Sequence, residues 1–327
     1  MPAHLSELGH GWLRRGQAIL MGAAIGFGIV IFSSYWNEIG AVQWQVTPLT
    51  FFASLFVLVG ALSGWAWVWA WLVRQLGAPN ASLYRLAATM IQSGMAKYLP
   101  GALWNYIARS YFGHSVTVGQ KSIWLANLLE LIAAIGTGFL LYGASLMWPH
   151  RHQPMLSAAT AIFLGLLCFA CGSPSALALV FRTAGTLPRL NHLNSWPSLS
   201  WVDYCLLLVS SVLTWLWVGG GFWLLVLSVY PVQNFHAVEL VGGWLFSFVA
   251  GLLAIGVPQG IGVRDGILVV ILSASMPLPT AIGLATLSRL WLIIGDFVTP
   301  FLWAAGRQGH AILRRESHTR NDPSRHV

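Results

Sequence analysis

The chain alternates long apolar runs with short polar linkers. About 20 apolar residues carry a helix across the hydrocarbon core of a bilayer, so we expect each long run to form a transmembrane helix. The expected spans cover residues 17–36, 48–73, 122–148, 155–172, 202–229, 238–257 and 280–305. The pattern therefore predicts an all-α, polytopic membrane protein.

Two further apolar segments are interrupted by proline and glycine. The interrupting residues are Pro100 and Gly101 within residues 84–112, and Pro258, Gly260 and Gly262 within residues 256–277. Proline disfavours helix at the residue before it, and glycine permits unusual backbone angles. The apolar piece after the second interruption is roughly 16 Å long as a helix, about half the hydrocarbon thickness. We therefore expect two re-entrant or broken helical segments.

The two interrupted segments lie one in each half of the chain, and each carries an arginine shortly after its proline and glycine. This arrangement is typical of transporters built from internal repeats, whose site lies where two broken elements meet. We therefore expect about eight transmembrane helices, with an internal duplication as a hypothesis. We also expect Gly101 and Gly262 to lie within about 15 Å of each other, near one cavity lined by Glu130 and Arg264.

Composition and charge support a membrane protein and set its orientation. Hydrophobic residues make up 57% of the chain and charged residues only 8%, which leaves no room for a soluble domain with a solvated surface. Residues 1–306 are expected to form the membrane domain, and residues 307–327 a basic, disordered tail. The net charge of +8 comes from arginines in linkers and in the tail, so it indicates topology and lipid contacts and not a nucleic-acid partner. This distribution places both termini in the cytoplasm, with the linkers near Glu38 and Gln233 outside.

Three basic residues belong to the interrupted segments: Lys97, Arg109 and Arg264. Ionisable groups at membrane depth are expensive and mark functional sites by default. If the three converge on one cavity, an anion is the expected ligand, and a phosphate group suits them best because arginine can bind it through two parallel hydrogen bonds. The alternative is that each residue marks the membrane interface or extends its charged end to it.

Other charged residues lie inside apolar runs and need partners. Glu130 shares a helical face with Asn127, and two roles remain open for it: a structural ion pair with a neighbouring helix, or a place in a proton or substrate pathway. Arg289 and Asp296 lie seven residues apart and so share a face. Asp265 and Glu130 are both candidate partners for them.

Enzymatic and metal-binding patterns are weak. The sequence lacks the metalloprotease, nucleophile-elbow and P-loop motifs. His150 and His152 have no third ligand at a useful spacing, so an interfacial pair is the favoured interpretation. We therefore expect no enzyme activity, no catalytic residues, no metal and no cofactor.

The motifs resemble those of one known family. Lys97 to Gly101 with Trp104 and Arg109, the intramembrane Glu130, and the run from Pro258 to Asp265 together resemble the transmembrane domain of the lysylphosphatidylglycerol synthase family. The resemblance covers about residues 12 to 306 and is to the stand-alone members of the family, which are called flippase-like. Where that family often has Glu after Gly-Val-Arg, this chain has Asp265. The soluble aminoacyl-transferase domain is absent, so the resemblance does not imply aminoacylation.

The resemblance implies a multi-pass protein of the bacterial inner membrane. We expect it to bind and translocate an anionic lipid between leaflets: a phospholipid, an aminoacylated phospholipid or a polyprenyl-phosphate-linked lipid. The predicted headgroup ligands are Lys97, Arg109 and Arg264, supported by Glu130, Asp265, Arg289 and Asp296. The alternative is a non-transporting subunit that presents a lipid to a cell-envelope glycosyltransferase. A membrane-embedded transferase is a third, weaker hypothesis, because no acid/base constellation is present.

Overall fold

The computed structural model describes residues 26, 30, 33–98, 104–113, 118–147, 155–185, 196–230, 237–254, 257 and 260–320. Every regular element among these residues is a helix, so the predicted all-α class is confirmed for this part of the chain. The elements are α2 (Trp36–Ala41), α3 (Pro48–Gln75), α4 (Leu83–Ser93), η1 (Gly94–Tyr98), α5 (Trp104–Gly113), α6 (Gln120–Leu146), α7 (Met155–Gly172), α8 (Pro174–Gly185), α9 (Trp201–Val229), α10 (Ala237–Leu253), α11 (Val263–Ser273) and α12 (Leu278–Arg320).

Four described helices are long and apolar enough to cross a membrane: α3, α6, α9 and residues 278–306 of α12. Helices α7 and α8 form a fifth candidate if the pair, bent by 56°, counts as one span. The helix at the expected span 238–257 is shorter than predicted, since α10 ends at Leu253. The chain reaches Pro258, which disfavours helix at the residue before it, five residues later. The expected first span, residues 17–36, lies almost entirely outside the described residues. A total of eight spans remains a prediction.

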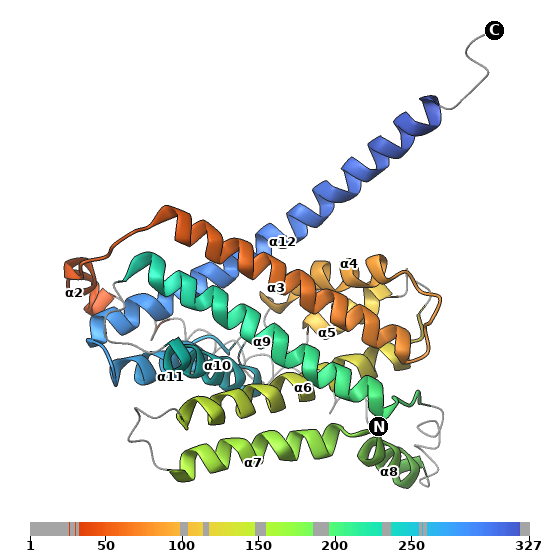
Figure 1. Ribbon diagram of the computed structural model, residues 1–327, viewed down its shortest axis with the longest axis horizontal. Helices are drawn as coiled ribbons and strands as arrows, with labels where there is room; N and C mark the ends of the chain where they lie inside the picture. The colour runs from red at the N-terminus through yellow and green to blue at the C-terminus, as the bar shows by residue number, and fades with distance from the viewer. Residues whose placement is uncertain are drawn as a thin grey trace, which may run out of the picture.

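The long helices pack in neighbouring pairs. Helix α3 lies along α9, and α6 lies along α7 and also contacts α10 (Figure 1). A core with Trp215, Phe222, Trp244 and Trp291 at its centre joins α9, α10 and α12. Burial of such large aromatic side chains gives tight helix contacts, and these contacts fix the positions from which the polar side chains reach inward.

The first interrupted segment forms two short helices. Helix α4 begins at an N-cap serine, whose hydroxyl accepts a hydrogen bond from the backbone N–H of Arg85. The 3₁₀ turn η1 ends at Tyr98, and α5 begins at Trp104. Pro100 and Gly101 lie outside the described residues, so the predicted distance between Gly101 and Gly262 stays a prediction.

The second interrupted segment turns sharply before α11. Gly260 and Gly262 have φ angles of 60° and 82°, in the region that glycine adopts at little cost. A Cβ on Gly260 would lie 2.5 Å from the Cα of Gly251 on α10. Asp265 then caps α11, because its carboxylate accepts a hydrogen bond from the backbone N–H of Gly262 at 3.2 Å. Pro258 lies outside the described residues.

The last helix extends beyond the expected membrane domain. Helix α12 continues past Gly306 to Arg320, and the division of the chain at residue 306 stays a prediction. Figure 1 shows this part of α12 leaving the helical bundle. Residues 321–327 lie outside the described part of the chain.

Candidate functional site

A cavity of about 180 Å³ lies among α3, α4, η1, α5, α6, α10 and α12. Its wall is mostly apolar, with side chains such as Trp65, Met90 and Phe248. Charged residues from four different elements also line it: Lys97 of η1, Arg109 of α5, Glu130 of α6 and Asp296 of α12. The cavity therefore combines an apolar wall with two cations and two carboxylates.

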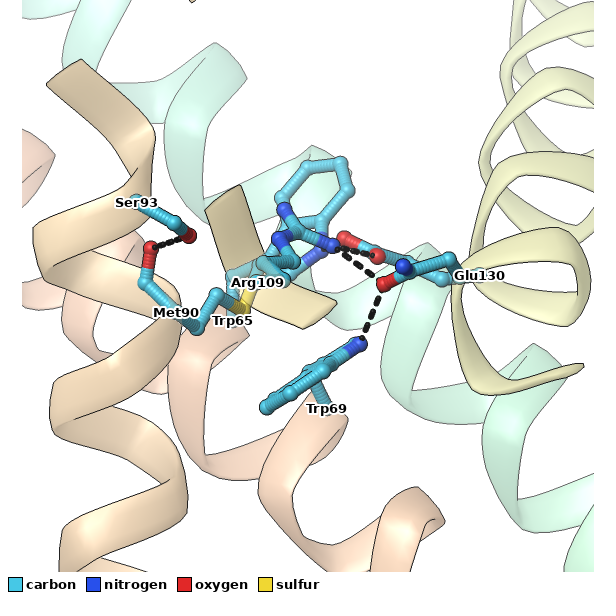
Figure 2. Close-up of polar contacts among 7 residues, drawn as sticks. Trp65, Trp69, Met90, Ser93, Arg109 and Glu130 are labelled. Carbon is cyan, nitrogen blue, oxygen red and sulfur yellow. Dashed lines mark hydrogen bonds and ion pairs between the residues drawn. The ribbon is translucent and has the colours of Figure 1, made fainter. Parts of the chain in front are cut away.

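Arg109 and Glu130 form the central ion pair of this cavity. Figure 2 shows both side chains pointing toward each other, with Trp65 and Trp69 of α3 beside them. One Glu130 oxygen accepts from Nη1 of Arg109, and the other accepts from Nε1 of Trp65. Both charged residues are buried, with exposed fractions of 6% for Arg109 and 9% for Glu130. A buried ion pair is costly to desolvate, and the hydrogen bond from Trp65 to Glu130 offsets part of that cost.

Asn127 and two aromatic rings orient Arg109. The side-chain oxygen Oδ1 of Asn127 accepts hydrogen bonds from Nη1 of Arg109 at 3.2 Å and from Nε1 of Trp69 at 2.9 Å. The guanidinium carbon lies 5.5 Å from the centroid of the Trp69 ring and 5.3 Å from that of Tyr106, within the range of a cation–π contact. The guanidinium is thus held in one orientation, with its plane set before any ligand arrives.

Lys97 pairs with the second carboxylate of the cavity. Its ammonium lies 2.5 Å from Oδ2 of Asp296, which also accepts a hydrogen bond from the Tyr98 hydroxyl at 2.5 Å. Asp296 therefore ties η1, in the middle of the first interrupted segment, to α12.

The second interrupted segment is held by the same helix. Nη1 of Arg289 lies 2.8 Å from Oδ2 of Asp265, so one of the two partners expected for Arg289 is confirmed. Arg289 and Asp296, two turns apart on α12, thus bind α11 and η1 respectively. The sequence showed that these two residues share a face, but it did not indicate Lys97 as a partner.

Arg264 does not join the other two cations. It is not among the residues that line the cavity. Its guanidinium lies 4.6 Å from the Phe248 ring centroid and 5.3 Å from that of Trp244. Gly251 provides the space, since a Cβ there would lie 3.0 Å from the Cβ of Arg264. Phe248 also lines the cavity, so Arg264 lies behind that wall.

Several polar atoms around the cavity are buried without a hydrogen-bond partner among the described residues. They are Nε of Arg109, Nδ2 of Asn127, Oδ1 of Asn105 and Oγ of Ser110, and, behind the wall, Nε and Nη2 of Arg264. A buried polar atom without a partner costs free energy. Arg109 Nε and Asn127 Nδ2 are donors, which suit an acceptor such as a phosphate oxygen.

Sequence reasoning missed Trp65, Trp69 and Tyr98 as parts of the site. Trp65 and Trp69 are four residues apart and so lie on one helical face, but the same run also contains Trp67 and Trp71. Such a cluster of tryptophans is equally typical of a membrane interface. Only the buried acceptors on α6 distinguish the two inward-facing rings. Tyr98 had no sequence signal beyond its place in the interrupted segment.

No metal site is evident in the described ranges, where no three His, Cys, Asp or Glu side chains gather closely enough. No family model, curated protein or solved structure matches this chain. The resemblance to the lysylphosphatidylglycerol synthase family therefore rests on the motifs of the sequence.

Proposed function

We propose that this membrane protein binds the anionic headgroup of a lipid in the cavity at Arg109 and moves the lipid between leaflets. The observation that carries the proposal is Arg109 itself, a buried, preoriented guanidinium on a cavity wall. Its Nε–H group has no partner in the part of the chain that the structure describes. The apolar remainder of the wall suits acyl or polyprenyl chains, and the polar atoms suit a phosphate.

Lys97 is the second headgroup ligand in this proposal. Lys97 lies before the interruption at Pro100 and Gly101, Arg109 lies after it, and both line the same cavity. Lys97 is less buried than Arg109, with 23% of its side chain exposed. Lysine acts on phosphate as a mobile point charge, whereas arginine fixes the geometry. Arg264 adds positive potential from behind Phe248 without touching the headgroup, which revises its predicted role.

The finer architecture belongs to the same proposal. We infer about eight spans, two re-entrant segments related by an internal duplication, both termini in the cytoplasm and a location in a bacterial inner membrane. One observation supports the pairing of the two segments: η1 and α11, which flank the two interruptions, both bind α12, through Asp296 and Arg289. That shared contact brings the two segments to one helix.

A second candidate is a lipid-presenting subunit that does not transport. It is favoured by the same two ion pairs, since they tie both interrupted segments to α12 and describe a rigid binding site. In that case the partner would be a cell-envelope glycosyltransferase. The two candidates agree on binding and differ in whether the protein alone exchanges lipid between leaflets.

Binding at Arg109 is tested by a conservative substitution. We expect Arg109→Lys to weaken binding of a short-chain phosphatidylglycerol by about tenfold or more, because lysine cannot reproduce the two parallel hydrogen bonds of the guanidinium. The matched control is Arg182→Lys on the exposed face of α8, which should bind as the wild type does. Equal affinity in both variants, measured by calorimetry in detergent, would contradict the proposed site.

A further inference from the structure

Glu130 lies between two cavities. One is the headgroup cavity, and the other is a space of about 10 Å³ between α3, α6 and α9. Trp65 and Glu130 line both. The small space is about the size of one water molecule, and its wall on α9 carries the hydroxyl groups of Ser211 and Thr214. The hydroxyl of Ser211 lies 3.1 Å from the hydroxyl of Thr137 on α6. The hydroxyl groups of these residues therefore form a polar row that leads away from Glu130.

Glu130 also competes with a ligand of the headgroup cavity. Its carboxylate occupies Nη1 of Arg109, one of the two donors that a phosphate bound end-on to the guanidinium, through Nη1 and Nη2, would use. A phosphate that takes this donor leaves Glu130 without its cation. Arg109 is the only cationic partner of Glu130 among the described residues. A buried carboxylate that loses such a partner is strongly destabilised, and it avoids that cost by binding a proton.

The other groups near Glu130 do not remove this cost. Arg109 and Tyr106 face it from α5, while Lys97 from η1 and Asp296 from α12 line the same cavity and neutralise each other. The residues of α3 and α9 that line the two cavities carry no charge. Trp65 donates one hydrogen bond to Glu130, which a protonated carboxyl retains on its carbonyl oxygen.

We propose that Glu130 is the proton-binding site of this protein, so that a phosphate-bearing headgroup and a proton bind together. The inference rests on the proposed function and supplies its coupling ion. In the step, the Arg109–Glu130 contact breaks, a phosphate oxygen takes Nη1 of Arg109, and Glu130 binds one proton that the bulk solvent supplies by way of the small cavity. One negative charge and one positive charge enter together, so the net charge of the site is unchanged.

The linkage is tested by counting protons during binding. We titrate the detergent-purified protein with dioctanoyl phosphatidylglycerol in buffers of different ionisation enthalpy. The wild type should take up about one proton per lipid and bind more weakly as pH rises, because binding of proton and lipid must favour each other reciprocally. Glu130→Gln should bind without proton uptake, and at alkaline pH about tenfold more tightly than the wild type, since the internal competitor is gone. Glu38→Gln, an exposed carboxylate, should behave as the wild type.

Proton uptake that persists in Glu130→Gln, or lipid binding by the wild type without proton uptake, would overturn the inference. A second measurement stands apart from lipid binding. Arg109→Gln removes the cationic partner of Glu130, so Glu130 should be protonated in this variant at neutral pH. The infrared difference spectrum between Arg109→Gln and the double variant Arg109→Gln/Glu130→Gln should then show the band of a protonated carboxyl. The absence of that band in a folded variant would refute the proton site. Absence of lipid binding in the wild type with the band present would refute only the proposed function.

The small cavity gives a kinetic test of the proton route. Thr214→Val with Ser211→Ala removes the two hydroxyls that line it. Equilibrium proton uptake should persist, whereas the rate of uptake after a pH jump should fall at least about tenfold, since a positioned relay contributes on that scale. An unchanged rate would place the route through the headgroup cavity and contradict this part of the inference.

Discussion

At the scale of the residue, Arg264 is a buried charge that forms no ion pair with a carboxylate among the described residues. It is 3% exposed, and Nε and Nη2 have no hydrogen-bond partner among the described residues. Its contacts are the faces of Trp244 and Phe248, which attract a cation but replace only part of its lost hydration. Such a residue is expensive for stability, and this cost indicates a role in the electrostatics of the site.

The cost is measurable by a substitution that keeps the shape. Arg264→Met retains a flexible chain against two aromatic rings and removes the charge. We expect the free energy of unfolding to stay equal or to rise by about 1 to 4 kcal/mol, measured by thermal unfolding in detergent. Arg264→Ala leaves a void and serves as the comparison. A loss of stability in Arg264→Met as large as that in Arg264→Ala would show that the charge itself stabilises the fold.

At the scale of the element, α12 holds both interrupted segments. Asp296 binds Lys97 and Tyr98 of η1, and Arg289 binds Asp265 at the start of α11. Both contacts come from one helical face. Short helices contribute little stability by themselves, so these ion pairs add to the packing that holds η1 and α11 in place.

Asp296→Asn should therefore release η1 from α12. The change leaves Lys97 partly buried without a counter-ion, and we expect a loss of about 3 kcal/mol in the free energy of unfolding. Adding Lys97→Met should restore most of the loss, since it removes the uncompensated charge. The exposed Glu38→Gln should change stability by less than about 0.5 kcal/mol. Additive effects of Asp296→Asn and Lys97→Met in the double-mutant cycle would contradict the ion pair.

At the scale of the whole molecule, the sequence predicted the long helices well. The expected spans at residues 48–73, 122–148 and 202–229 correspond to α3, α6 and α9, because long apolar runs bounded by polar linkers have few other stable forms. The sixth expected span failed at its end, where the helix stops at Leu253. Apolar composition alone does not show where a helix ends.

The site was harder to predict because its partners are distant in sequence. Glu130 and Trp65 are 65 residues apart, and Tyr98 and Asp296 are 198 apart. Sequence reasoning identified the charged residues from the cost of placing them in a membrane. It could not assign Arg109 to Glu130 or Lys97 to Asp296, since those pairs depend on how whole helices pack. For the same reason it grouped Arg264 with the cavity cations.

The most direct test of the central claim is leaflet exchange by the pure protein. Vesicles reconstituted with the wild type and a headgroup-labelled phosphatidylglycerol should expose inner-leaflet label to a membrane-impermeant quencher, and label on a polyprenyl-phosphate analogue in parallel vesicles tests the other lipid class. We expect exchange of at least one lipid above protein-free vesicles, a strong decrease in Arg109→Lys, and no change in Arg182→Lys. Lipid binding without any leaflet exchange would contradict translocation and support the lipid-presenting subunit.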